Sequence, residues 1–115
     1  MTAAQFRRIA LRLPEAAESA HMSHPDFRVR GKVFASLGYP DAGWGMVKLT
    51  PKQQRLVLAA EPEMFAPAKG AWGKAGATCA RLKAAKAKPL AAVLTAAWRN
   101  TAPKVLVRAF DEENP

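Results

Sequence analysis

The chain has 115 residues, of which 50% are apolar and 23% charged, and its formal net charge is +9. This length suits one domain with one core, and the composition excludes a disordered chain. No apolar run is long enough for a transmembrane helix, and we expect no signal peptide because the N-terminal segment lacks a long apolar stretch. The single cysteine, Cys79, excludes an internal disulfide and a cysteine-based zinc cage. We therefore expect a cytoplasmic protein.

The N-terminal segment predicts a helix followed by short strands. Residues 3–13 carry apolar side chains at helical spacing, with arginines on the other side, and Pro14 ends the helix. Residues 27–30 alternate strictly, which predicts a strand with Phe27 and Val29 facing inward and two arginines facing solvent.

The next segment extends this sheet. A turn at residues 31–32 leads into a second strand over residues 33–37, so the two strands should form a hairpin. Residues 39–45 are rich in turn-forming residues and predict a loop. A further strand is expected over residues 46–49.

A second helix has a clear start signal. Thr50 can cap it, Pro51 suits its first position and Gln53 completes a capping box, so a helix is predicted to about residue 60. Residues 62–76 contain many helix breakers and predict an irregular stretch. Two pairs of side chains are expected to fix this stretch to the core: Met64-Phe65 and Ala71-Trp72.

The C-terminal third predicts one strand and two helices. A strand is expected over residues 77–82. The helix that opens at Pro89 has a continuous apolar stripe, formed by Leu90, Val93, Leu94, Ala97 and Trp98. A short last helix should run from about residue 103 to residue 110. This order predicts a single α+β domain over residues 1–115, with an antiparallel sheet and helices packed on one side.

Positive charge is concentrated in the second half of the chain. Residues 1–63 have a net charge of +3, whereas residues 64–110 have +9 and contain no acidic residue. The acidic tail, residues 111–115, contributes −3. A long stretch without carboxylates indicates a polyanionic partner such as nucleic acid. The alternative is a positively charged surface that serves only solubility.

Three groups of basic residues form the predicted nucleic-acid-binding site. The first lies on the solvent side and tip of the hairpin, the second in the glycine-rich loop, and the third along the last strand and the approach to the long helix. Together they are Arg28, Arg30, Lys32, Lys69, Lys74, Arg81, Lys83, Lys86 and Lys88. Such side chains could neutralise phosphates without reading sequence, so any DNA binding should be weakly sequence-specific at best.

Several phrases of the sequence resemble the MmcQ/YjbR family over about residues 3–110. They are HPDFRV at 24–29, GKVFA at 31–35, WGMVKLTP at 44–51, GAWG at 70–73, and AWR at 97–99 followed by APK at 102–104. The resemblance implies a CyaY-like fold. It also implies DNA binding through a "double wing" of hairpins, an expectation that rests on fold comparison.

Metal binding and catalysis have weaker support. His21, His24 and Asp26 could supply two imidazoles and a carboxylate to iron or zinc, but the His-Pro-Asp phrase is more typical of a structural turn. The first helix has no acidic residue that could form an iron-binding face. No nucleophile has a recognisable base beside it, and the glycines of residues 70–76 lack phosphate-loop spacing. We therefore expect no metal, no cofactor and no enzymatic activity.

The aromatic residues leave two interpretations open. Trp98 is predicted to be core, whereas Trp44 and Trp72 lie beside glycines, where they could anchor a loop or stack on a base; anchoring is favoured. The leading hypothesis is a non-enzymatic nucleic-acid-binding protein that contacts phosphates through basic hairpins. The alternative is a module that binds a protein or a small anionic ligand, with incidental positive charge and no membrane partner.

Overall fold

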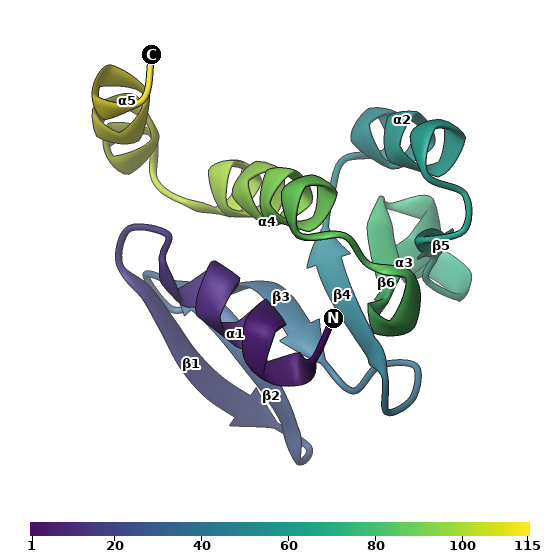
Figure 1. Ribbon diagram of the computed structural model, residues 1–115. Coiled ribbons are helices and arrows are strands. Elements are labelled where there is room, and N and C mark those ends of the chain that lie inside the picture. The colour runs from purple at the N-terminus through teal and green to yellow at the C-terminus, as the bar shows by residue number, and fades with distance from the viewer.

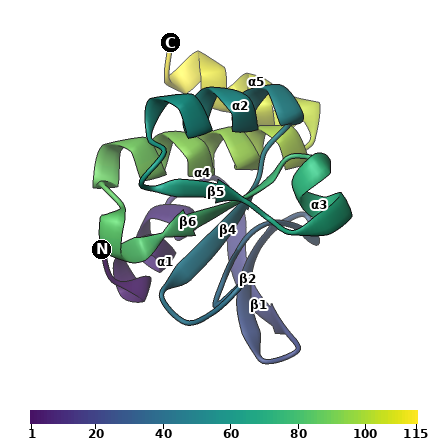
Figure 2. The ribbon, with the colours of Figure 1, turned by 90° about the vertical axis from the view of Figure 1, so that its right-hand side faces the viewer.

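The computed structural model describes residues 1–115 and contains a six-stranded antiparallel sheet flanked by helices (Figures 1 and 2). The order across the sheet is β1-β2-β3-β4-β6-β5. The strands are β1 (Ala16–His21), β2 (His24–Val29), β3 (Lys32–Leu37), β4 (Trp44–Lys48), β5 (Phe65–Pro67) and β6 (Ala77–Arg81). The helices are α1 (Ala3–Leu11), α2 (Pro51–Ala60), α3 (Gly70–Lys74), α4 (Ala87–Thr101) and α5 (Lys104–Glu113). None of them is both long and apolar enough to cross a membrane.

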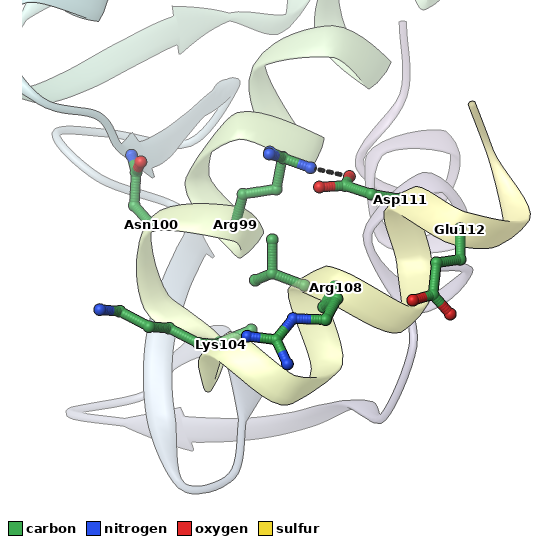
Figure 3. Close-up of a pocket in the computed structure, with 8 residues that line it drawn as sticks. Arg99, Asn100, Lys104, Arg108, Asp111 and Glu112 are labelled. Atoms are coloured by element: carbon green, nitrogen blue, oxygen red, sulfur yellow. Dashed lines mark hydrogen bonds and ion pairs between the residues drawn. The ribbon is translucent and has the colours of Figure 1, made fainter.

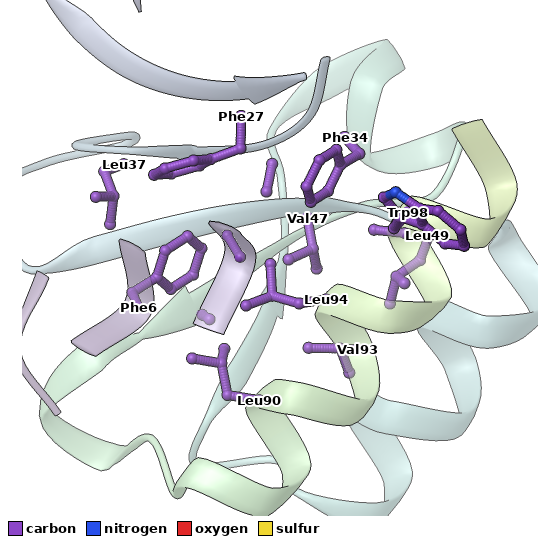
Figure 4. Close-up of a cluster of buried hydrophobic side chains, with 14 of the residues drawn as sticks. Phe6, Phe27, Phe34, Leu37, Val47, Leu49, Leu90, Val93, Leu94 and Trp98 are labelled. Atoms are coloured by element: carbon purple, nitrogen blue, oxygen red, sulfur yellow. The ribbon is translucent and has the colours of Figure 1, made fainter. Parts of the chain in front are cut away.

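One face of the sheet is covered by helices and holds the main core. Helices α1 and α4 pack there, and the aromatic rings of Phe6, Phe27 and Phe34 are fully buried between them and the strands (Figure 4). Gly45 of β4 is required in this packing because a Cβ at its position would lie 2.6 Å from the ring of Phe6. The predicted α+β class, with an antiparallel sheet and helices on one side, is confirmed.

The apolar stripe of α4 is buried as predicted. Leu90, Leu94 and Trp98 are each fully buried. The indole N–H of Trp98 donates to the carbonyl of Pro14 at 2.9 Å, and its ring centroid lies 5.2 Å from that of Phe110. Trp98 therefore connects the segment after α1 with α5, and its one polar atom is satisfied in the core.

The opposite side of the sheet, which we call the open face, has a second and smaller buried cluster. Met46 of β4, Cys79 of β6 and Ala68 form it. The strand register places Ser19, Asp26, Ser36, Met46, Cys79 and Ala66 in one row across the sheet. Strands β4 and β6 are thus buried on both faces, since Val47 and Ala80 point into the main core.

The sequence-based prediction omitted strand β1 and misplaced the turn beside it. The His24-Pro25-Asp26 phrase, predicted as a turn, forms the start of β2. The turn lies at the two preceding residues, Met22 and Ser23, whose φ angles are 49° and 68°. Two adjacent residues with positive φ give a tight hairpin turn that matches the twist of its strands. Strand β1 was not predicted because it is an exposed edge strand whose residues show no alternation of apolar and polar side chains.

The stretch over residues 62–76 is more ordered than predicted. It contains strand β5 and helix α3. Met64 and Phe65 are buried as expected, but Trp72 is 59% exposed, so the prediction that the Ala71-Trp72 pair fixes this stretch to the core is wrong. The residue of α3 that points inward is Gly73, where a Cβ would lie 1.8 Å from the carbonyl oxygen of Ala68. This close backbone approach turns Trp72 outward.

We predict that Trp98→Ala will lower the free energy of unfolding by about 3–5 kcal/mol, because it removes a large buried ring and its hydrogen bond to Pro14. Denaturant titration followed by circular dichroism measures the effect. A midpoint equal to that of the wild type would contradict the core assignment.

Candidate nucleic-acid interface

Two of the three basic residues of the predicted hairpin site have carboxylate partners within the protein. Arg28 donates two hydrogen bonds to Asp26, at 2.8 and 3.0 Å, and its side chain is 32% exposed. Arg30 donates to Glu15 at 2.6 and 3.1 Å. Lys32, at the start of β3, is exposed and has no carboxylate within ion-pair distance. Of the hairpin group, Lys32 alone is a free cation.

Asp26 is the centre of this arrangement. Its side chain is fully buried on the open face, and His21 Nδ1 lies 2.7 Å from its second oxygen. The hydrogen bond from Arg28, followed by that from His21, holds the pKa of Asp26 below its ordinary value, although burial acts in the opposite direction. Asp26 therefore joins β1 and β2 through side-chain hydrogen bonds to His21 and Arg28.

His21, His24 and Asp26 do not form a set of metal ligands. Both carboxylate oxygens of Asp26 accept hydrogen bonds from Arg28, and no group of three or more His, Cys, Asp or Glu side chains lies close enough together to hold a metal ion. The thiol of Cys79 is buried beneath the open face, and burial raises its pKa. A buried thiol with a raised pKa is a weak nucleophile.

The basic residues of the second half are exposed, and most have no acidic neighbour. Lys69 and Lys74 flank α3, Arg81 ends β6, and the remaining residues of this group follow β6: Lys83, Lys86 and Lys88. Of these six residues, only Lys86 meets a carboxylate, at 3.5 Å from Glu61, and outside this group Arg99 is paired with Asp111. Strand β4 separates this group from the hairpin of β2 and β3. The nine predicted residues therefore form two groups: three on the hairpin of β2 and β3, and six on or beside α3, the end of β6 and the start of α4.

Three aromatic side chains on the open face were not singled out as one group by the sequence. The guanidinium of Arg81 lies 4.3 Å from the ring centroid of Trp44, and the ring of Trp72 lies 5.9 Å from that of Tyr39. Tyr39 and Trp44 pack against the buried Met46 and Cys79 cluster. We call Tyr39, Trp44, Trp72 and Arg81 the aromatic face. Trp44 and Arg81 lie side by side because they are directly paired in the register of β4 with β6.

A concavity of about 580 Å³ lies elsewhere, between the end of α4 and α5 (Figure 3). Its lining mixes charges of both signs, because Arg99 is paired with Asp111 while Lys104, Arg108 and Glu112 point into the same region. A smaller one, of about 360 Å³, is lined in part by Arg7, His24 and Trp44. Neither has a uniformly basic lining.

Comparison with known proteins identifies the class of this domain. Its fold is similar to the crystal structure of Deinococcus radiodurans protein DR2400, which has a DUF419 domain: the TM-score is 0.70 and the sequence identity 18%, over 86% of this chain and 77% of that chain. A family model described as YjbR matches residues 11–100. The chain belongs to the YjbR family, and the resemblance found in its sequence is confirmed over that range. No curated protein matches the sequence.

The matched range ends before the last helix. Helix α5 begins at Lys104, whereas the family model stops at residue 100. The helix extends to Glu113 rather than ending near residue 110, so the acidic residues assigned to a tail form its last turn. One of them, Asp111, pairs with Arg99 of α4. Helix α5 has no fully buried residue and packs on the core through partly buried side chains such as Leu106 and Phe110.

We predict that Asp26→Asn will lower the free energy of unfolding by about 1–3 kcal/mol at neutral pH, since Arg28 loses its buried carboxylate partner. The folded pKa of Asp26 lies below the unfolded value, so its ionised form stabilises the protein above the unfolded pKa. That stability is lost as pH falls through the folded pKa.

Urea titrations at neutral pH, pH 5 and pH 3 measure this effect. The difference between wild type and variant should shrink toward acid pH, below the ordinary aspartate value of 3.8. Glu15→Gln is the matched control, because it removes an exposed carboxylate partner of the neighbouring Arg30. A difference for Asp26→Asn that is constant with pH would contradict the assignment.

Proposed function

We propose that the protein binds nucleic acid without catalysing a reaction, and that its basic side chains contact phosphates. The observation that carries this proposal is the group of exposed cations in a stretch of 47 residues, 64–110, that contains no carboxylate. Lys69, Lys74 and Lys83 have no acidic partner within ion-pair distance. Cations without internal partners are available to replace the counterions of a polyanion.

The nine residues of the site contribute unequally to phosphate binding, because some of them are already paired with carboxylates of the protein. Lys69, Lys74, Arg81, Lys83 and Lys88 have no carboxylate partner, and Lys32 extends the site to the hairpin. Lys86 contributes less because Glu61 lies 3.5 Å away. Arg28 and Arg30 contribute mainly by holding the hairpin through Asp26 and Glu15. Lysine contacts to phosphate carry no sequence information, so binding is weakly specific. The one thiol, that of Cys79, is buried and has a raised pKa, which supports a non-enzymatic role.

Measuring the affinity for duplex and single-stranded DNA at a series of salt concentrations tests this proposal. The logarithm of affinity should fall linearly with the logarithm of salt concentration, with a slope of about −0.9 for each duplex phosphate neutralised. The triple variant Lys69→Ala/Lys74→Ala/Lys83→Ala should flatten that slope by up to about 2.7, because each lysine neutralises at most one phosphate. Lys32→Ala alone tests the hairpin without leaving a buried Asp26 unpaired.

The matched control is Lys52→Ala/Arg55→Ala/Lys104→Ala, which removes the same charge from exposed positions on α2 and α5. Equal loss of affinity in both triple variants would mean diffuse attraction and no localised site. If the wild type binds neither duplex nor single strands at low salt, the nucleic-acid proposal fails. The remaining explanation would then be a module for a protein or a small anionic ligand.

A further inference from the structure

We infer that the aromatic face binds single-stranded nucleic acid by stacking an unpaired base on Trp72, with phosphates held by the surrounding cations. This inference rests on the proposed function and adds to it the class of ligand and the residue that recognises it. The ligand class follows from the combination of a fixed, exposed indole ring with free positive charge, which is the arrangement that single strands require.

Trp72 is held in its exposed position by backbone packing rather than by its own burial. Trp72 is 59% exposed, yet the backbone of α3 is fixed at Gly73, whose carbonyl accepts a hydrogen bond at 3.0 Å from the buried side-chain amide of Gln54. The same amide donates to the carbonyl of Ala77 at 2.9 Å. Because the backbone is already fixed, only the side-chain torsions of Trp72 remain to be ordered when a base stacks on it, which lowers the entropic cost of binding.

Gly76 fixes the chain just after the C-terminus of α3. Its φ angle is +114°, and a Cβ there would lie 2.0 Å from the carbonyl oxygen of Leu49, so only glycine fits at this contact. The hydroxyl of Thr78 donates to the carbonyl of Gly76 at 2.8 Å. The segment thus presents Trp72 from a helix whose C-terminal half is anchored at Gly73 and, just beyond its end, at Gly76.

The cation–π pair of Arg81 and Trp44 forms the second part of the aromatic face. Arg81 stacks over Trp44 at 4.3 Å, which places a guanidinium plane over one ring. A guanidinium in this position can stack on a base and also bind a phosphate. Tyr39 contacts Trp72 at a centroid distance of 5.9 Å and supports its ring from the side. Beneath them, Met46 and Cys79 form an apolar floor.

The charge around these rings fits a phosphate chain. Lys48 of β4 and Lys69 and Lys74 beside α3 are exposed. Strands β4 and β6 and helix α3 contain no acidic residue, and Asp41 is the one carboxylate of the loop between β3 and β4. In a duplex the faces of the bases are covered by their neighbours, so an exposed indole ring favours a strand with unpaired bases.

The test compares two single strands of about ten nucleotides, an oligothymidylate and an abasic strand that keeps the phosphates but lacks the bases. Wild-type protein should bind the oligothymidylate more tightly. Trp72→Ala should weaken that binding by about 5- to 150-fold, the range measured for loss of one stacked base, and should leave the abasic strand unaffected. Trp72→Phe should keep most of the affinity. Labelled strands and fluorescence anisotropy at one low salt concentration give the affinities.

Leu56→Ala is the matched control, since Leu56 is a 63% exposed apolar side chain on α2, away from the aromatic face, and its removal should leave both affinities unchanged. Trp72 is exposed, so thermal midpoints of the variants should match that of the wild type. As an independent measurement, the oligothymidylate should quench the fluorescence of the wild type more than that of Trp72→Phe.

Two results would overturn the inference while leaving the proposed function intact. One is equal binding of the oligothymidylate by wild type and Trp72→Ala, together with a lysine-dependent salt slope on duplex DNA. The other is equal wild-type affinity for the oligothymidylate and the abasic strand. Absence of binding to any nucleic acid by the wild type would overturn both the inference and the proposed function.

Discussion

Helix α4 organises the main core, because it lays Leu90, Leu94 and Trp98 along the face of the sheet that α1 also covers. The open face has only the smaller buried cluster and keeps exposed side chains around it. The same helix fixes its neighbours: the Trp98 indole bonds the chain just after α1, and its ring contacts Phe110 of α5. Five of the 18 buried residues of the main core come from α4, and they contact strands, α1 and α5 at once. The open face can then carry exposed tryptophan and lysine side chains at little cost to folding.

The open face is stabilised by a different kind of interaction on each half. Near β2, the buried carboxylate of Asp26 is compensated by Arg28 and His21. Near β4 and β6, Met46 and Cys79 are covered by aromatic rings. A buried carboxylate is stable there only while its hydrogen-bonding partners remain in place, so Arg28 is committed to the fold. Available positive charge consequently lies toward α3 and β6, where the carboxylates are absent.

The sequence predicted the elements whose patterns come from burial or capping. The capping box of Thr50 and Gln53 is present at the start of α2, and the stripe that includes Trp98 is buried in α4. Strand β1 could not be predicted because five of its six residues are exposed and carry no apolar period. Its place is set by pairing with β2 and by contacts with residues remote in sequence, such as Arg7 with Glu18.

The site was predicted less completely than the fold. Whether a charged side chain is free for a ligand depends on which residues lie next to it in space, and the sequence does not show those neighbours. A linear sequence shows that Arg28 and Arg30 alternate with apolar residues, but it does not show that Asp26 and Glu15 lie within hydrogen-bond distance of them. Likewise, the pairing of Trp44 with Arg81 requires the β4–β6 register, which joins residues far apart in the chain. Local pattern identifies which residues are charged or aromatic, whereas the sheet determines which of them are free.

The glycines around Trp72 show how this assembly works at the level of backbone packing. They lack phosphate-loop spacing, and their role is instead steric: Gly73 lets α3 approach Ala68, and Gly76 lets the chain pass against Leu49. With the small residue facing inward, the neighbouring indole must face outward, because successive helix positions point in different directions. The exposure of Trp72 is therefore a consequence of how α3 packs, and a larger residue at position 73 would displace the helix that holds the ring.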